Sequence, residues 1–168
     1  AFDAMIATDL ALAVCYPNAG NIGGGGFLVY RKSDGSVGSL DYREKAPLAS
    51  YKDMYLDSDG NVIEGKSTIG GMAIGVPGTV AGLYEVHNKL GTLPWEELVQ
   101  PAIDLATNGY IVTINQANSF SSKRNDFVNI NGEETLFAKE FKPGDTVINI
   151  QLANTLKEIQ KNGKSGFY

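Results

Sequence analysis

Hydrophobic and polar positions change their spacing several times along the chain, and each spacing predicts a different element. Residues 1–16 are apolar on nearly every side, which indicates a helix buried between layers. Residues 26–32 and 36–42 are short runs rich in β-formers, and the Ser-Asp-Gly triplet between them is typical of a hairpin turn. A second turn of this kind lies within residues 54–65. The first part of the chain is therefore predicted to be a helix followed by an antiparallel hairpin.

Helical spacing returns after Pro77. Residues 78–91 place apolar side chains at roughly helical intervals, and Gly91 is a natural stop. Residues 149–163 form the last clear element, a helix with one stripe that should face the core: Leu152, Leu156 and Ile159. Both predicted helices end at a glycine, the residue favoured just after a helix.

Two prolines interrupt the region between these helices. Pro94 can occupy the first turn of a helix, where the missing N–H has no intrahelical partner to lose. Pro101 lies seven residues later and is expected to divide the region into two short helices. Asn108 and Gly109 should end the second of them.

Composition restricts the functions that the chain can have. With 168 residues, 43% of them hydrophobic, residues 1–168 are expected to form a single domain with its own core. The 14 basic and 19 acidic residues give a net charge of −5, and no basic stripe is present, which disfavours a nucleic-acid or anionic-membrane partner. One cysteine excludes an intrachain disulfide, and one histidine excludes the usual zinc clusters. We expect neither a metal nor another cofactor.

Both ends of the sequence suggest a longer parent protein. The chain opens directly in a helical pattern, with neither an N-cap nor a signal peptide. It closes shortly after Gly163, where a new element is about to begin. Residues 1–168 are therefore expected to be a fragment truncated at both ends.

Four consecutive glycines, Gly23, Gly24, Gly25 and Gly26, precede the predicted hairpin. They match neither the Walker pattern nor Gly-x-Gly-x-x-Gly. Their order is also unlike that of a dinucleotide loop, because here a helix leads through glycines into a strand. The run is better explained by close approach of neighbouring backbone or by positive φ angles, and a ligand or partner chain could be what approaches.

The usual nucleophiles have little support. Cys15 lies near the end of an apolar helix with no base or cation nearby in sequence, so we interpret it as a core residue. His87 is expected on a partly exposed helix face, and no Gly-x-Ser-x-Gly motif occurs. A Ser/His/Asp hydrolase is therefore not supported.

Charged residues gather just after the second predicted strand. Asp41, Arg43, Glu44 and Lys45 lie within five positions. Taken alone, such a group is most simply a surface ion-pair cluster at the end of a strand.

Several longer stretches carry a family resemblance. They are the Asp3-Ala4 pair, the glycine run, and the segments DYREKAP, PGTVAG and PAIDLATNG. Together they resemble the large subunit of gamma-glutamyltransferases over nearly the whole chain. The resemblance implies an α+β fold, part of an N-terminal-nucleophile hydrolase αββα sandwich with helices packed on an antiparallel sheet. It also implies a precursor that cleaves itself, with the catalytic threonine at the start of the small subunit. That threonine lies downstream of the matched region, so no catalytic residue is expected in this chain.

The resemblance assigns roles to residues that composition left open. Arg43 matches the family arginine that binds the α-carboxylate of the gamma-glutamyl donor, and a planar guanidinium suits bidentate recognition of a carboxylate. Glu44 is a weaker candidate that could orient this arginine. Gly23 to Gly26 would shape the substrate site by allowing close backbone approach.

The implied function is transfer or hydrolysis of the gamma-glutamyl group of glutathione and related compounds. The implied partners are that substrate and the small subunit of the same precursor, and the implied location is periplasmic or extracellular. Without the missing subunit, this chain alone should be inactive and should self-associate through exposed sheet edges or apolar surface. Two alternatives stay open: a non-catalytic binding or interaction domain of the same fold, and a related acylase that acts on acylated β-lactams. The arginine segment favours gamma-glutamyl substrates.

Overall fold

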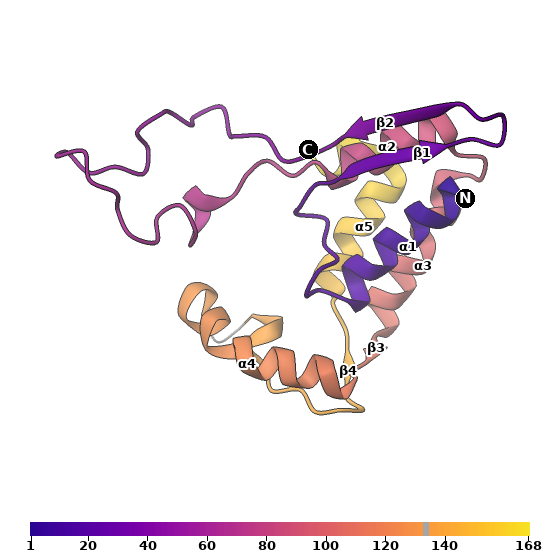
Figure 1. Cartoon of the computed structure of the whole chain (residues 1–168). Helices are drawn as coiled ribbons and strands as arrows, with labels where there is room; N and C mark the ends of the chain where they lie inside the picture. The colour runs from indigo at the N-terminus through magenta and orange to yellow at the C-terminus, as the bar shows by residue number, and fades with distance from the viewer. Residues whose placement is uncertain (133–134) are drawn as a thin grey trace.

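Four helices form the centre of the molecule: α1 (Phe2–Cys15), α2 (Thr79–Leu90), α3 (Trp95–Asn108) and α5 (Ile150–Asn162). The computed structural model describes every residue except 133 and 134 (Figure 1). Helix α3 packs extensively against both α1 and α5, and α2 contacts α1. The side chains at the centre of this packing are fully buried: Ile6, Leu10, Leu83, Val99, Leu156 and Ile159.

An antiparallel hairpin of strands β1 (Phe27–Arg31) and β2 (Val37–Asp41) lies beside α2 (Figure 1). The positive φ of 87° at Gly35 forms the turn, as the Ser-Asp-Gly triplet predicted. Burial alternates along both strands. One face, with Leu28 and Leu40, packs on the core, and the other face is exposed.

The remaining elements are short, apart from one helix. Strands β3 (Tyr110–Ile111) and β4 (Thr146–Val147) form a second antiparallel pair, and helix α4 (Ile114–Asn131) lies between them in sequence. Within residues 1–132 and 135–168, three short 3₁₀ helices complete the order: η1 (Gly71–Ala73), η2 (Leu136–Ala138) and η3 (Gly163–Gly166). Helices packed on small antiparallel sheets confirm the α+β prediction.

Residues 46–76 form a long excursion that leaves the body of the molecule (Figure 1). An isolated bridge between Lys45 and Val76 closes its base. Within it, Leu56 pairs with Val62 around a tight turn. The second predicted turn, within residues 54–65, is therefore confirmed.

The prediction of two helices around Pro101 is wrong, because α3 runs without a break from Trp95 to Asn108. A proline inside a helix removes one hydrogen bond and crowds the preceding turn. Here Pro101 is exposed, while the residues around it bury their side chains in one core: Leu98, Val99, Ala102 and Ile103. Packing on both sides of the proline outweighs its local cost. Pro94 lies directly before the first turn, and Gly109 ends the helix as predicted.

Helix α1 is confirmed, but it is not buried all round. Its core side chains face the other helices, whereas Leu12 and Ala4 are exposed. Helix α5 confirms the predicted stripe, since Leu156 and Ile159 are buried and Leu152 packs against the core.

Helix α4 was not predicted, although the sequence contains a start signal for it. Thr113 and Gln116 form a capping box, in which each side chain bonds the backbone N–H of the other residue. The helix has few buried side chains, Ala117 and Phe120, so its hydrophobic spacing is weak.

Candidate functional site

Arg43 lies between two backbone pairings that fix the chain on both sides of it. On one side, the Tyr42 N–H donates to the Gly26 carbonyl at 3.0 Å, and the Gly26 N–H donates to Tyr42 at 3.3 Å. On the other side, Lys45 and Val76 exchange hydrogen bonds of 3.0 and 2.7 Å. The backbone N–H of Arg43 itself donates to the Asp41 carboxylate at 3.0 Å. The Arg43 backbone is therefore held, while its side chain is exposed.

The glycine run crosses directly over this backbone. A methyl group on Gly25 would lie 2.6 Å from the Tyr42 carbonyl oxygen and 2.9 Å from the Cα of Arg43. None of the four glycines in the run has a positive φ. Close approach, and not an unusual backbone conformation, is thus the physical reason for glycine at position 25.

The same run also holds the start of α2. The carbonyl of Gly24 accepts hydrogen bonds from the N–H groups of Gly78 and Thr79, at 2.8 and 3.0 Å. These N–H groups belong to the first turn, where no intrahelical acceptor is available. The glycine run therefore joins the Arg43 segment to the N-terminus of α2.

Tyr42 is part of this site and was missed by the sequence analysis. Its ring lies against Gly82 of α2 and against Gly26, and a methyl group on Gly26 would come within 2.7 Å of the ring. Gly78 packs against the Tyr42 carbonyl. The glycines of the PGTVAG segment, four residues apart at the start of a helix, were the available signal.

A hollow of about 580 Å³ opens beside Arg43, within the usual size range of small-molecule pockets. Its charged lining residues are Asp41, Arg43, Lys45, Glu85 and Lys164. Glu85 pairs with Lys89 at 2.9 Å. Among the described residues, the Arg43 guanidinium has no ion pair and no hydrogen bond, so the surface ion-pair interpretation finds no support in the geometry.

The Glu44 side chain lies against glycines of two other segments. Its side chain lies beside Gly75 and toward Gly24, with the Glu44 Oε1 atom 3.6 Å from where a methyl group on Gly24 would be. Across the part of the chain that the structure describes, no hydrogen bond joins Glu44 to Arg43. An orienting role for Glu44 stays a prediction.

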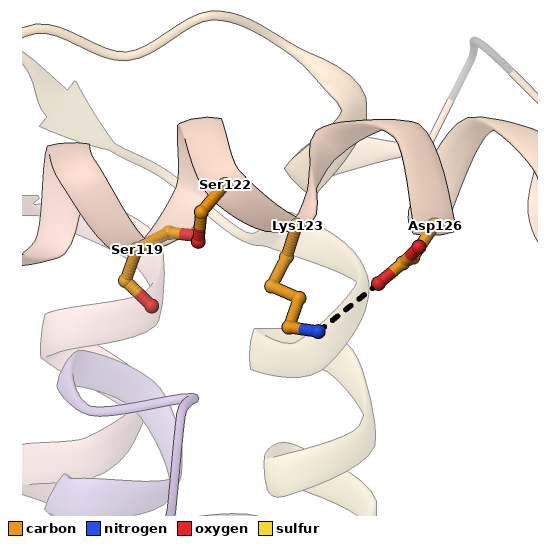
Figure 2. Close-up of polar contacts among 4 residues, drawn as sticks. All are labelled: Ser119, Ser122, Lys123 and Asp126. Carbon is orange, nitrogen blue, oxygen red and sulfur yellow. Dashed lines mark hydrogen bonds and ion pairs between the residues drawn. The ribbon is translucent and has the colours of Figure 1, made fainter.

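A second hollow, of about 520 Å³, lies between α4 and residues 17–23. Its one cationic lining residue, Lys123, pairs with Asp126 at 3.1 Å (Figure 2). Two serines on the same helix are also drawn there, and the Ser122 hydroxyl donates to the Ser119 carbonyl at 2.9 Å. Because its lysine already has an anionic partner, this hollow suits a carboxylate less well than the one beside Arg43.

The other residues considered from sequence occupy structural positions. The His87 Nε2 lies 2.9 Å from the Leu93 carbonyl oxygen, and its ring packs against Trp95 with centroids 5.3 Å apart. Cys15 is half-buried, and its carbonyl accepts a hydrogen bond from the Gln116 side chain. Within residues 1–132 and 135–168, no cluster of three or more metal-ligating side chains forms. None of the described helices is both long and apolar enough to cross a membrane.

Comparison with known proteins agrees with the resemblance seen in the sequence. The family model for gamma-glutamyltranspeptidase matches residues 1–168. A glutathione hydrolase proenzyme from Pseudomonas aeruginosa is 47% identical over 171 residues, which cover 100% of this chain and 30% of that protein. The crystal structure of Helicobacter pylori gamma-glutamyltranspeptidase superposes with a TM-score of 0.96 at 44% identity, over 100% of this chain and 49% of that one. A cephalosporin acylase from Bacillus halodurans is more distant, with a TM-score of 0.83 at 25% identity over 100% of this chain and 32% of that one.

The chain therefore belongs to the gamma-glutamyltranspeptidase family. It spans about 30% of the length of the curated relatives that it matches.

Proposed function

We propose that this chain is part of the large subunit of an enzyme that transfers or hydrolyses the gamma-glutamyl group of glutathione and related compounds. In this proposal, Arg43 binds the α-carboxylate of the gamma-glutamyl donor. The observation that carries it is a guanidinium without an ion pair or hydrogen bond among the described residues, on a backbone fixed from both sides, at the edge of a hollow large enough for a small molecule.

The chemistry of the side chain supports this assignment. A guanidinium presents several donors in one plane and stays charged at any working pH, so it can hold both oxygens of a carboxylate. Gly25 lets the glycine run cross the Arg43 backbone without displacing it. We therefore assign the glycine run a supporting role, in which it sets the position from which Arg43 reaches the donor.

This chain supplies binding groups and no nucleophile in the proposed enzyme. The attacking threonine belongs to the small subunit of the same precursor, which is the expected partner. That subunit would also cover apolar surface left open here, such as the outer face of the hairpin with Val29 and Val37, which are 81% and 75% exposed. The expected location is the periplasm or the cell exterior, in keeping with the family.

The proposal is tested on the complete precursor with a gamma-glutamyl anilide as donor. Arg43→Ala should raise KM for the donor much more than it lowers kcat, because the carboxylate lies away from the scissile amide and is held equally in the ground and transition states. Loss of one member of a charged pair should lower kcat/KM by a factor that corresponds to about 2–5 kcal/mol of transition-state stabilisation. Arg31→Ala is the matched control, since Arg31 is an exposed arginine at the far end of the same hairpin.

Self-cleavage must be measured with the kinetics, because an uncleaved variant would imitate a binding defect. A correctly cleaved Arg43→Ala enzyme with the parental KM would remove the assigned role of Arg43. A precursor that never turns over a gamma-glutamyl donor would favour the non-catalytic alternative. Turnover of acylated β-lactams in place of gamma-glutamyl donors would favour the acylase.

A further inference from the structure

Tyr42 occupies a slot lined by two glycines. Gly26 lies directly before β1 and Gly82 lies in α2, and both approach the ring closely. A methyl group on either glycine would overlap the ring. The slot therefore accepts a flat side chain and leaves it little freedom to move.

The backbone of Tyr42 is held as firmly as its ring. It forms a hydrogen-bonded antiparallel pair with Gly26, and Gly78 packs against its carbonyl. The start of α2 that carries Gly78 is fixed in turn, because the Tyr168 hydroxyl donates to the Pro77 carbonyl at 2.6 Å. Two separate parts of the chain thus contact this tyrosine, and Tyr168 braces one of them.

The Tyr42 side chain is half-buried. Burial raises the pKa of Tyr42, and the nearby Asp9 carboxylate of α1 raises it further. Burial also raises the pKa of Asp9. The tyrosine is accordingly neutral near pH 7 and serves this site through its shape and not through its charge.

Tyr42 and Arg43 are consecutive residues directly after β2, and both line the hollow of about 580 Å³. A small rotation of the Tyr42 backbone would also rotate the backbone of Arg43. The resulting displacement would be largest at the far end of the long Arg43 side chain.

We propose that Tyr42 is a positioning residue for Arg43: its ring, packed against Gly26 and Gly82, fixes the backbone from which the guanidinium reaches the donor carboxylate. This inference rests on the proposed function of Arg43. A misplacement of about 1 Å can cost about 100-fold in rate, so a partial loosening is expected to cost about 10-fold.

The test uses steady-state kinetics of the complete, self-cleaved enzyme with a gamma-glutamyl anilide. Tyr42→Leu and Tyr42→Ala should raise KM for the donor about 10-fold and change kcat by less than about 3-fold. Tyr42→Phe keeps the flat ring and should bring KM back to within about 3-fold of the parent. Should Tyr42→Ala fail to mature, Tyr42→Leu, which retains apolar volume, carries the test.

The hairpin supplies a matched control at its other end. Tyr30 lies over its cross-strand partner Gly38 on the same face of the sheet, as Tyr42 lies over Gly26. Tyr30→Ala should lose stability in the same way but keep the parental KM. An equal rise in KM for both variants would mean that Tyr42 acts only through general stability, and the inference would be wrong.

A double-mutant cycle separates this inference from the proposed function. If Tyr42 acts through Arg43, then Tyr42→Leu should change KM very little in an Arg43→Ala background. An additive rise there would overturn the inference. If Arg43→Ala raises KM but Tyr42→Leu keeps the parental KM, the inference alone is overturned. If Arg43→Ala keeps the parental KM, the proposed function and the inference are overturned together.

Discussion

Gly25 crosses the backbone of Arg43 at a distance that leaves no room for a side chain at position 25, since a methyl group on Gly25 would lie 2.9 Å from the Cα of Arg43. The four glycines of the run are not equivalent in this respect. A methyl group on Gly23 would have the Asn21 Oδ1 as its nearest atom, at 3.6 Å. The requirement for glycine is thus strict at the crossing point and weak two residues earlier.

Gly25→Ala should therefore impair the stability and self-cleavage of the precursor, whereas Gly23→Ala should not. The added methyl at Gly25 meets backbone atoms, which cannot move aside as a flexible side chain can. Overpacking of this kind costs about 1–3 kcal/mol. We expect a lower melting temperature and less self-cleavage for Gly25→Ala, measured by calorimetry and by gel electrophoresis. Equal behaviour of the two variants would show that close approach at Gly25 does not matter.

Arg43→Lys should separate bidentate recognition from simple attraction. Lysine keeps the positive charge but offers it as a point, without the planar fork that matches a carboxylate. We expect KM for the gamma-glutamyl donor to lie between those of the parent and of Arg43→Ala. A lysine variant with the parental KM would indicate that charge alone is sufficient.

Periodicity and turn chemistry predicted much of the fold. The hairpin, α2 and the buried stripe of α5 follow from local spacing and from glycines at the turns and stops, so each could be found without knowing the tertiary structure. Pro101 shows the limit of local rules. Its effect was overestimated because the core that holds α3 on both sides of it is assembled from other helices.

The candidate site was only partly predictable for a similar reason. Arg43 stood out through its motif, but the Tyr42 slot depends on Gly82, which is 40 residues away in sequence. No periodicity connects two such positions, because the contact exists only once the hairpin packs on α2. Helix α4 was missed for a different reason. Its capping box is present in the sequence, but its hydrophobic spacing is too weak to predict a helix.

The isolated chain should self-associate through the outer face of the hairpin. Among the described residues, each strand of this two-stranded sheet has one unpaired edge, and Val29 and Val37 are 81% and 75% exposed. Light scattering at tens of micromolar should show species larger than the monomer. Val29→Thr combined with Val37→Thr should shift the chain toward the monomer, because threonine keeps the strand preference but removes apolar area.

Val62→Thr is the control for this experiment. Val62 is also 75% exposed but lies on the excursion, away from the sheet. Its replacement should leave the association unchanged. A strictly monomeric parent chain at high concentration, or an equal effect of Val62→Thr, would contradict association through the hairpin face.

The contact between Asp3 and Thr92 should make part of the stability depend on pH. The Asp3 carboxylate accepts hydrogen bonds from the hydroxyl and, at 2.9 Å, from the N–H of Thr92, which ties the start of α1 to the loop after α2. These bonds lower the pKa of Asp3 below its ordinary value of 3.8, with the hydroxyl as the largest cause. A carboxyl group with a lowered pKa stabilises the fold at a pH above its unfolded pKa. The contribution is lost as the pH falls through the folded pKa.

Thr92→Val removes the hydroxyl and keeps the backbone N–H, so it isolates the larger of the two bonds. At pH 7 the variant should be less stable than the parent, and this difference should shrink as the pH falls below 3.8 toward the lowered pKa of Asp3. Urea unfolding can be followed through the single tryptophan, Trp95, which is buried, at concentrations low enough to prevent association. Thr155→Val is the control, because the Thr155 hydroxyl donates to the Gln151 carbonyl and, within the described residues, has no carboxylate partner. The difference in stability between Thr155→Val and the parent should not change with pH. If the difference in stability between Thr92→Val and the parent also stayed constant between pH 7 and pH 3, Asp3 would not be the group that titrates.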